Sequence, residues 1–373
     1  MKQNTKRRTE NKNNKKIGRF ILLFIIVSIA LSSTTFRNNI IEFLSQKNKT
    51  ISIEEKININ CNNNIKVKIF KDNIIQQNNS NLISYDINGN KKWEKPIPYE
   101  KFLVHIGNEK IYMGNTVSGE ITALNENGQV VWKYEPKQSI TQIFEQKGNL
   151  FVLLKPSNDL NQVNVVNEKG ELVSNLVSNE GNFIYGNISN NEKTLALTAL
   201  DTSDNIIKSK LLLYSPSGNL LWQESFENEI LQYIDFIGED IIIVSDKKIS
   251  LFNKNKKLLW SRDISGKIKD IKIYNNKIYL LTNQGTDLLE VVSLKGRTED
   301  NIEIKEELQT IYSYKKHIFL VGKNNVIGIS GNDKFVEYST NNNIEYFSMA
   351  NKKVLLFTDS GVKVGYIVNR NAK

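Results

Sequence analysis

The chain is poor in the residues that build many catalytic and metal centres. Its 373 residues include one cysteine, Cys61, and two histidines, His105 and His317. A single thiol excludes an intramolecular disulfide and any cysteine-based zinc cluster. We interpret Cys61 as an incidental thiol near the start of the folded part, with an intermolecular or redox role as the alternative. The histidines fall in different copies of the repeat described below, which favours structural roles over metal binding.

Two common nucleotide and hydrolase motifs are also missing. The sequence contains neither a G-x-S-x-G nucleophile elbow nor a G-x-x-x-x-G-K-[ST] phosphate loop. After residue 50, no stretch shows a sustained helical period of 3.6 residues. These absences give an enzyme hypothesis little support, and we expect no catalytic residues, no metal and no cofactor.

Positive charge is concentrated at one end of the chain. The formal net charge is +10, and residues 1–19 (MKQNTKRRTENKNNKKIGR) contain eight Lys or Arg and one Glu. Seven of the ten net charges therefore belong to this tail. A protein that binds nucleic acid along its folded surface needs a basic face there. We therefore expect no nucleic-acid partner.

An uncharged, largely apolar run follows the tail. Residues 20–36 (FILLFIIVSIALSSTTF) are close to the minimum for a helix that crosses a hydrocarbon core about 30 Å thick. Because basic flanks stay in the cytoplasm, we expect a cytoplasmic tail at 1–19, a single-pass transmembrane signal-anchor at 20–36 and a spacer at 37–49. The remaining chain is then extracytoplasmic. Cleavage near the small residues Ser28 and Ala30, which would give a secreted protein, is the alternative.

The rest of the chain is repetitive. A polar turn, mostly with a glycine, recurs between two apolar segments, and in several copies a tryptophan follows four residues after the glycine. The copies are YDINGNKKW (85–93), LNENGQVVW (124–132), VNEKGELVS (166–174), YSPSGNLLW (214–222), FNKNKKLLW (252–260), VSLKGRTED (292–300) and the degenerate ISGNDKFVE (329–337). A period near 40 residues is long enough for four short strands and their turns.

Four-stranded sheets that recur at this period predict an all-β protein. Radial repetition packs each sheet against its neighbours, so we predict a β-propeller of four-stranded antiparallel blades over residues 50–370. First strands are expected near residues 65, 101, 139, 182, 230, 267 and 307. An eighth set has only three strands (IEYFSMA, KVLLFTD, VKVGYIV). The strand at 50–57 (TISIEEKI) can complete it, which favours eight blades over the alternative of seven.

The strand–turn–tryptophan pattern resembles the PQQ-like, or quinoprotein-type, propeller repeat, whose usual form is ALDxxTGxxxW. The resemblance covers about residues 50–370 and is strongest in copies one, two, four and five, as in YDINGNKKW, TALNENGQVVW and LYSPSGNLLW. The layout of tail, anchor and propeller is similar to membrane-anchored propellers of Gram-positive bacteria that are grouped under a domain of unknown function. Quinoprotein enzymes of this fold use a pair of adjacent cysteines, and the single cysteine here gives no support for a bound quinone.

The repeated residues are expected to be structural. A glycine in a tight hairpin turn supplies a positive φ angle, and the resemblance implies that the following tryptophan docks against the adjacent blade. Cofactor stacking is the alternative role for the tryptophans. The predicted turn glycines are Gly89, Gly128, Gly170, Gly218 and Gly296, and the predicted blade-docking residues are Trp93, Trp132, Trp222 and Trp260.

Differences between copies point to a binding surface. The loop between the second and third strands lengthens in copy three (155–162) and copy four (199–210). Insertions in adjacent repeats often form a binding surface, although tolerated drift gives the same pattern. The candidate partner-binding residues are Ser157, Asp159, Asp201 and Asp204. A calcium site at Asp201 and Asp204 is less favoured, because D-x-D-x-D spacing is missing.

Taken together, these features predict a membrane-anchored extracytoplasmic scaffold that binds a protein or cell-wall partner without catalysis. One alternative is an envelope enzyme that acts on glycan at the propeller channel. A second alternative is an extracytoplasmic sensor that signals through the anchor, although a 19-residue tail is too short for a folded signalling domain.

Overall fold

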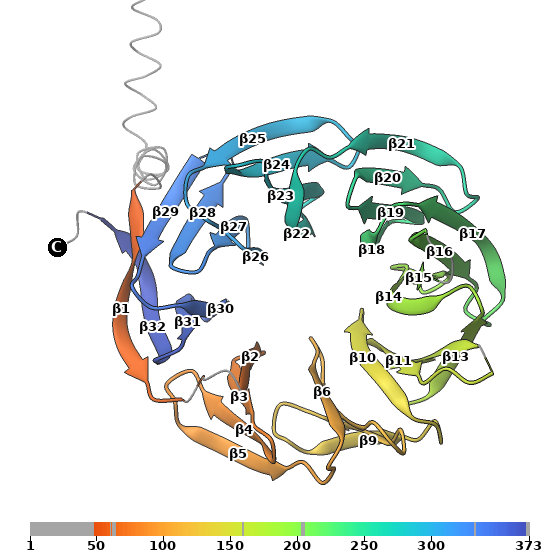
Figure 1. Cartoon of the computed structure of the whole chain (residues 1–373). Helices are drawn as coiled ribbons and strands as arrows, with labels where there is room; N and C mark the ends of the chain where they lie inside the picture. Colours follow the sequence, from red (N-terminus) through yellow and green to blue (C-terminus); the bar gives the residue numbers. More distant parts are fainter. Residues whose placement is uncertain are drawn as a thin grey trace, which may run out of the picture.

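The described part of the molecule is a ring of β-sheets (Figure 1). The computed structural model describes residues 48–59, 61, 65–158, 160–202, 206–331 and 333–370. Within these ranges there are 32 strands and no helix. The described residues therefore include no helix that is long and apolar enough to cross a membrane. The predicted tail and signal-anchor lie outside the described residues.

Seven blades follow one another along the chain, each with four consecutive antiparallel strands. The first strand lies next to the ring axis and the fourth at the rim (Figure 1). Blades 1 to 4 contain β2 (Lys66–Phe70), β3 (Asn73–Gln77), β4 (Asn81–Asp86), β5 (Lys91–Pro96); β6 (Phe102–Ile106), β7 (Ile111–Asn115), β8 (Ile121–Leu124), β9 (Val130–Tyr134); β10 (Ile140–Gln146), β11 (Asn149–Leu154), β12 (Asn161–Val166), β13 (Leu172–Ser178); and β14 (Asn182–Ile188), β15 (Leu195–Asp201), β16 (Lys208–Tyr214), β17 (Leu220–Glu227). Blades 5 to 7 contain β18 (Leu231–Ile237), β19 (Asp240–Ser245), β20 (Lys248–Phe252), β21 (Leu258–Asp263); β22 (Lys267–Tyr274), β23 (Lys277–Asn283), β24 (Asp287–Ser293), β25 (Thr298–Ile304); and β26 (Thr310–Tyr314), β27 (His317–Val321), β28 (Asn325–Ser330), β29 (Asp333–Ser339).

Blade 8 is built from both ends of the ring. Its first three strands are β30 (Ile344–Ala350), β31 (Lys353–Thr358) and β32 (Gly361–Asn369), and its fourth strand is β1 (Lys49–Ile57). β1 pairs antiparallel with β32 along its length, from Lys49 opposite Asn369 to Ile57 opposite Val362. A bridge between Lys49 and Val336 also joins β1 to blade 7. The structure therefore has eight blades, and the alternative of seven is excluded. The first strands begin within three residues of their predicted positions.

The hydrophobic core lies between the blades. Eight clusters of buried apolar side chains each join two neighbouring blades, one cluster at every junction of the ring. Blade 4, for example, contributes Leu211 and Leu213 to a cluster with Ile234 and Ile241 of blade 5. Each fully buried side chain of this kind contributes about 1.5–3 kcal/mol. Each blade therefore depends on its two neighbours for its core.

The two faces of the ring carry different connections. Turns between first and second strands and between third and fourth strands lie on one side, which we call the turn face. Loops between second and third strands and the links from one blade to the next lie on the opposite side, the loop face. β1 begins at the turn face, where the Arg370 backbone N–H donates to the Asn48 carbonyl over 2.9 Å. Both ends of the described chain thus lie together at the turn face.

Candidate functional site

The four tryptophans fasten one blade to the next. Each lies on the fourth strand of its blade and donates its indole N–H to a backbone carbonyl in the third-to-fourth turn of the following blade. The pairs are Trp93 with Glu126 (2.9 Å), Trp132 with Glu168 (2.9 Å), Trp222 with Lys254 (2.8 Å) and Trp260 with Leu294 (3.2 Å). These contacts occupy the indole groups within the ring and leave no tryptophan in a ligand-facing position on the axis.

The turn glycines provide the surfaces on which these rings pack. Gly89, Gly128, Gly170, Gly218 and Gly296 all have φ between 73° and 89°. In three of them, a Cβ atom would lie 2.8 Å from a tryptophan ring of the preceding blade: Gly128 from Trp93, Gly170 from Trp132 and Gly296 from Trp260. Glycine is thus required both by the backbone angle and by the close approach of the indole.

Two junctions use a substitute for tryptophan. Ser174 occupies the tryptophan position of blade 3, and its hydroxyl donates to the Pro216 carbonyl in the turn of blade 4. At the closing junction, Ile57 of β1 packs against Gly89, where an added Cβ would clash with the isoleucine Cγ2. The docking position is therefore used even where the tryptophan is absent from the sequence.

The predicted partner-binding residues do not form one cluster. Ser157 lies in the blade 3 loop, where its backbone pairs with that of Leu160. Asp201 is not a loop residue: it ends β15, opposite Lys208. Its carboxylate bonds Lys210 Nζ at 3.2 Å. Asp159 and Asp204 lie outside the described residues.

The blade 4 loop is shorter than expected because strand pairing continues to Asp201, and Lys210 of β16 forms ion pairs beside it. Its Nζ also contacts Glu180 at 2.6 Å. Burial tends to lower the pKa of Lys210, but the hydrogen bonds to Glu180 and Asp201 outweigh it, and the pKa is raised. Pairing of 200–201 with 208–209 continues the hairpin. The loop is therefore 202–207, not 199–210, and the blade 3 loop is 155–160.

Exposed apolar side chains occur on the loop-face side of blades 2 to 5. Seven large apolar side chains from loops, links and strand ends there are between 38% and 61% exposed. We call them the loop-face patch: Val117, Leu160, Val177, Ile184, Ile206, Ile207 and Ile230. The sequence predicted a binding surface at the loops of blades 3 and 4, but it did not predict the patch residues that lie in blade links and at strand ends. These residues could have been found in the sequence as apolar residues at positions where neighbouring copies of the repeat have polar ones.

Hydrogen bonds hold the patch segments in place. Loops of one blade bond the link that follows: Ser139 Oγ donates to the Val117 carbonyl at 2.8 Å, and the Asn228 N–H donates to the Ile207 carbonyl at 2.9 Å. The Asp246 N–H donates to the Ile230 carbonyl at 3.0 Å. Beside Leu160, a hollow of about 230 Å³ lies between the blade 3 loop and the start of β14. The patch is thus a fixed, uneven surface.

Polar side chains near the axis join first strands to one another. Glu145 of β10 is buried and accepts the Tyr112 hydroxyl at 2.8 Å and the backbone N–H of Asn108 at 3.1 Å. The Glu145 backbone N–H donates to His105 Nε2 at 3.1 Å. Lys68 of β2 donates to the Ile106 carbonyl at 2.8 Å. His105 therefore has a structural hydrogen bond, whereas His317 of β27 lies with its ring centroid 4.5 Å from that of Phe335.

Burial controls the protonation of this cluster. Burial, followed by the charge of Lys68, lowers the pKa of His105 to about 4. His105 is therefore neutral at neutral pH, as its role as acceptor at Nε2 requires. Burial also lowers the pKa of Lys68, an effect that Glu145 opposes. Burial and the adjacent Glu145 raise the pKa of Tyr112.

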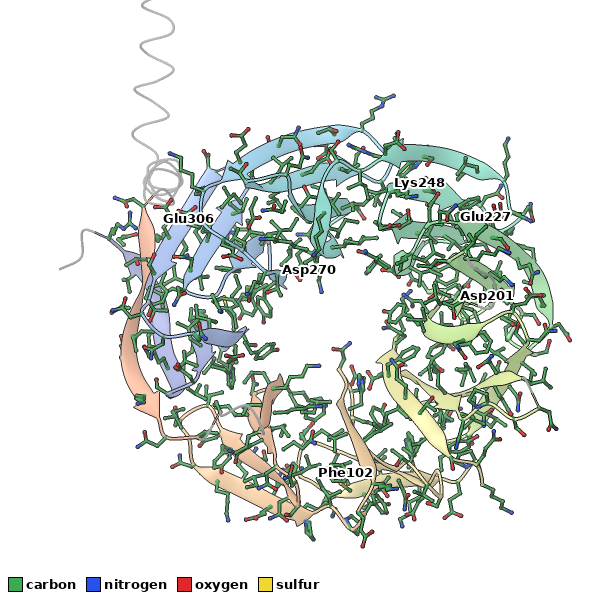
Figure 2. The ribbon with its side chains drawn as sticks, in the orientation of Figure 1. Phe102, Asp201, Glu227, Lys248, Asp270 and Glu306 are labelled. Atoms are coloured by element: carbon green, nitrogen blue, oxygen red, sulfur yellow. The ribbon has the colours of Figure 1, made fainter. Side chains whose placement is uncertain are left out.

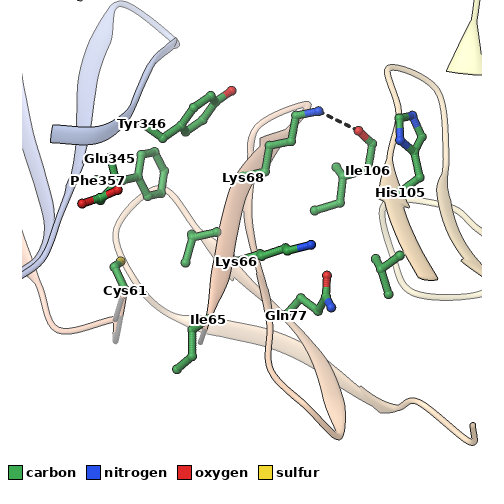
Figure 3. Close-up of a pocket in the computed structure, with 12 residues that line it drawn as sticks. Cys61, Ile65, Lys66, Lys68, Gln77, His105, Ile106, Glu345, Tyr346 and Phe357 are labelled. Atoms are coloured by element: carbon green, nitrogen blue, oxygen red, sulfur yellow. Dashed lines mark hydrogen bonds between the residues drawn. The ribbon is translucent and has the colours of Figure 1, made fainter. Parts of the chain in front are cut away.

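A cavity opens where the ring closes. It has a volume of about 470 Å³ and lies between blade 8, the first two strands of blade 1 and β6. Its lining includes Lys66, Lys68, His105, Tyr346 and Phe357 (Figure 3). By contrast, Asp270 of β22 faces the axis across the ring (Figure 2) but uses its carboxylate to accept the Ile311 N–H of blade 7 at 2.6 Å. Within the described ranges, no three His, Cys, Asp or Glu side chains are grouped to hold a metal ion.

Residues 44–366 match the model of a protein family, described as a family of unknown function, DUF5711. The chain belongs to the DUF5711 family. No curated protein matches it. The eight-bladed ring with its closing strand is therefore the structure of a DUF5711 member.

Solved structures share the DUF5711 ring. BamB from Moraxella catarrhalis is 10% identical with a TM-score of 0.55, over 85% of this chain and 99% of BamB. The computationally designed protein Ika8 is 13% identical with a TM-score of 0.56, over 85% and 98% of the two chains. Sqt1 from Saccharomyces cerevisiae is 11% identical with a TM-score of 0.54, over 86% and 99%. The structural similarity shows that the fold is a β-propeller. Because the sequence identities are low, the comparison shows nothing beyond the fold.

Proposed function

We propose that this DUF5711 protein is a membrane-anchored, extracytoplasmic scaffold that binds a protein partner through the loop-face patch. The observation that carries the proposal is the exposure of seven large apolar side chains over four consecutive blades. Exposed apolar side chains gathered on one face are typical of interaction sites. A protein partner fits such a surface better than a cell-wall glycan, which offers mainly hydroxyl groups.

The rigidity of the ring supports a scaffold. Every junction has its own apolar cluster, and tryptophan or its substitutes tie several of the rims together. A surface that is already ordered loses little conformational entropy when a partner binds. The patch is therefore suited to holding a partner without a conformational change.

The position of the chain ends supports the proposed orientation. We place the anchor at residues 20–36, and the described chain begins at the turn face. Residues 37–48 can span at most about 40 Å, even when fully extended. An anchor upstream would thus keep the turn face near the membrane and leave the loop face free for a partner.

Site-specific crosslinking in cells tests this function. A photoreactive amino acid at Ile207 should crosslink the full-length protein to one partner species, and the same probe at Leu160 should give the same species. Leu259 is a matched control: it is apolar and 44% exposed, but it lies on the rim strand β21. Equal crosslinking from Leu259, or none from the two patch positions, would remove the support for the patch as the binding surface.

A reporter fused after Lys373 tests the location separately. An enzyme that is active only after export should be active in this fusion, because the proposal places the propeller outside the cytoplasm. Activity of a cytoplasm-specific reporter at the same position would exclude the extracytoplasmic assignment. Such a result would not affect the crosslinking test of the binding surface, because the two tests are independent.

A further inference from the structure

The junction between blades 8 and 1 differs from most other junctions near the axis. At six junctions, a side chain from a first strand or its turn bonds the backbone of the next first strand. The bonds run from Lys68 to Ile106, His105 to Glu145, Lys147 to Ile188, Asn187 to Ile234, Asp270 to Ile311 and Tyr312 to Met349. In the described ranges, no such bond joins β30 to β2. The 470 Å³ cavity extends from this unbonded junction, around β2, to the junction between blades 1 and 2, where Lys68 bonds Ile106.

Strand β2 divides the cavity into two chemically different sides (Figure 3). On the side of blade 8 lie Tyr346 and Phe357, with ring centroids 5.3 Å apart, together with buried Cys61. Burial raises the pKa of the Cys61 thiol to about 11, so the thiol stays protonated and adds to an apolar wall. On the side of β6 lie Lys66, Gln77 and His105.

The polar side has an excess of hydrogen-bond donors. The Lys66 ammonium and the Gln77 amide make no hydrogen bond to other described residues. Lys68 uses one of its three N–H groups on the Ile106 carbonyl. Because His105 accepts at Nε2 and is neutral, its proton is on Nδ1, which has no acceptor among the described residues. Glu345, which is exposed, is the one carboxylate among the lining residues and lies at the other side of the cavity. The charge of Glu145 also acts on Lys68, but the Glu145 carboxylate already accepts from Tyr112 and from the Asn108 and Glu109 N–H groups.

We infer that this cavity binds an organic carboxylate with an apolar body. The carboxylate accepts from Lys66, Lys68 and His105, while the apolar body packs on Tyr346 and Phe357 across the edge of β2. A volume of about 470 Å³ is within the range of small-molecule sites. A free small acid and the C-terminal residue of a peptide have the same chemistry, so both are sources of such a ligand. The site is separate from the loop-face patch and does not depend on the proposed partner.

Ligand-observed NMR on the full-length protein in detergent micelles tests this inference. The probes are 3-phenylpropionate and an acetylated tripeptide that ends in phenylalanine, each compared with its C-terminal amide. We expect the acids to bind and the amides to bind at least about fivefold more weakly, since the amides lack the charge that Lys66 and Lys68 recognise. Preference for the free acid over the peptide, or the reverse, identifies the source of the ligand.

The variant Lys66→Met tests the charge without disturbing the core, because Lys66 is exposed. It should weaken acid binding about fivefold and leave the urea midpoint unchanged. Lys267→Met is the matched control: Lys267 is also exposed and begins the first strand of blade 6, but its cavity contains Asp287, Glu306 and Glu307. Equal binding of acids and amides, no acid binding at about 5 mM, or equal losses in the two variants would each overturn the inference.

Discussion

Single turn glycines show how backbone angle and packing act together. Gly128 has φ of 73° and faces the Trp93 ring, whereas Gly148 has φ of 79° and a Cβ added there would meet no atom within 4 Å. Gly148→Ala should therefore cost only the backbone term, about 1–2 kcal/mol. Gly128→Ala should cost about 1–3 kcal/mol more, because the new Cβ displaces the indole. Urea unfolding of both variants measures the difference; equal losses would mean that the Trp93 contact does not contribute.

His105 gives the ring a dependence on pH. Its pKa is about 4 in the folded protein, owing first to burial and then to Lys68, against 6.5 for an ordinary histidine. As the pH falls from about 6.5 to about 4, the unfolded chain gains a proton that the folded protein does not, so this contribution to stability is lost. Above pH 6.5 the contribution is complete.

The variant His105→Gln separates this effect from the titration of carboxylates. Glutamine retains an acceptor for the Glu145 N–H but does not titrate. Between pH 7 and pH 4.5 the variant should lose about 1–2 kcal/mol less stability than the unmodified protein in urea unfolding. The chain has two histidines, so NMR titration can assign both. An His105 pKa of 6 or above would contradict the prediction.

Among the elements, β1 has the largest effect on closure. It supplies the fourth strand of blade 8, and Ile51 and Ile57 enter the clusters that join blade 8 to blades 7 and 1. A chain that lacks residues 1–57 should therefore fail to form a closed monomeric ring, since the edge of β32 and both clusters become exposed. A chain that lacks residues 1–43 retains β1 and should fold. Size-exclusion chromatography and urea unfolding compare the two; equal midpoints would show that closure does not depend on β1.

The sequence predicts the blades better than it predicts the surfaces between them. The turn signal is local: Asn125, Gly128 and Trp132 lie within eight residues and repeat in other copies, so the first seven blades can be found from the chain alone. The eighth blade was only favoured over the alternative of seven, because its fourth strand comes from the other end of the ring. Lys256 has a φ of 68° at a turn position without glycine, and the repeat still located that turn. Asp201 was wrongly predicted to lie in a loop, because the end of a strand that carries alternating polar residues resembles a loop in sequence.

The candidate sites depend on contacts that sequence spacing does not encode. Tyr346 and Lys66, which are separated by 280 positions, line one cavity on opposite sides of β2 only because the ring closes. The loop-face patch includes Val117 from a loop, Ile184 from the strand β14 and Ile230 from a link between blades. Each residue looks ordinary in its own copy. The repeat pattern therefore predicts the architecture, whereas the binding surfaces follow from positions where the copies differ.

At the scale of the whole molecule, the proposed anchor predicts unequal access to the two faces. If residues 20–36 span the membrane, the short spacer keeps the turn face towards the lipid surface. Cysteines introduced at Lys193 and Lys316 lie on turn-face turns, and a cysteine at Val117 lies on the loop face, where Val117 is 61% exposed. The native Cys61 is buried with a pKa of about 11, so it should not react and need not be removed.

In intact cells stripped of their wall, a small maleimide should label all three introduced cysteines. A maleimide carried on a large polymer should label the Val117→Cys variant several-fold faster than Lys193→Cys or Lys316→Cys, because the bilayer blocks its approach to the turn face. Detergent provides the control: once the membrane is dissolved, the polymer should label all three at similar rates, since all three positions are exposed. Equal polymer rates in intact cells would contradict the orientation, and the absence of labelling by either reagent would contradict export itself.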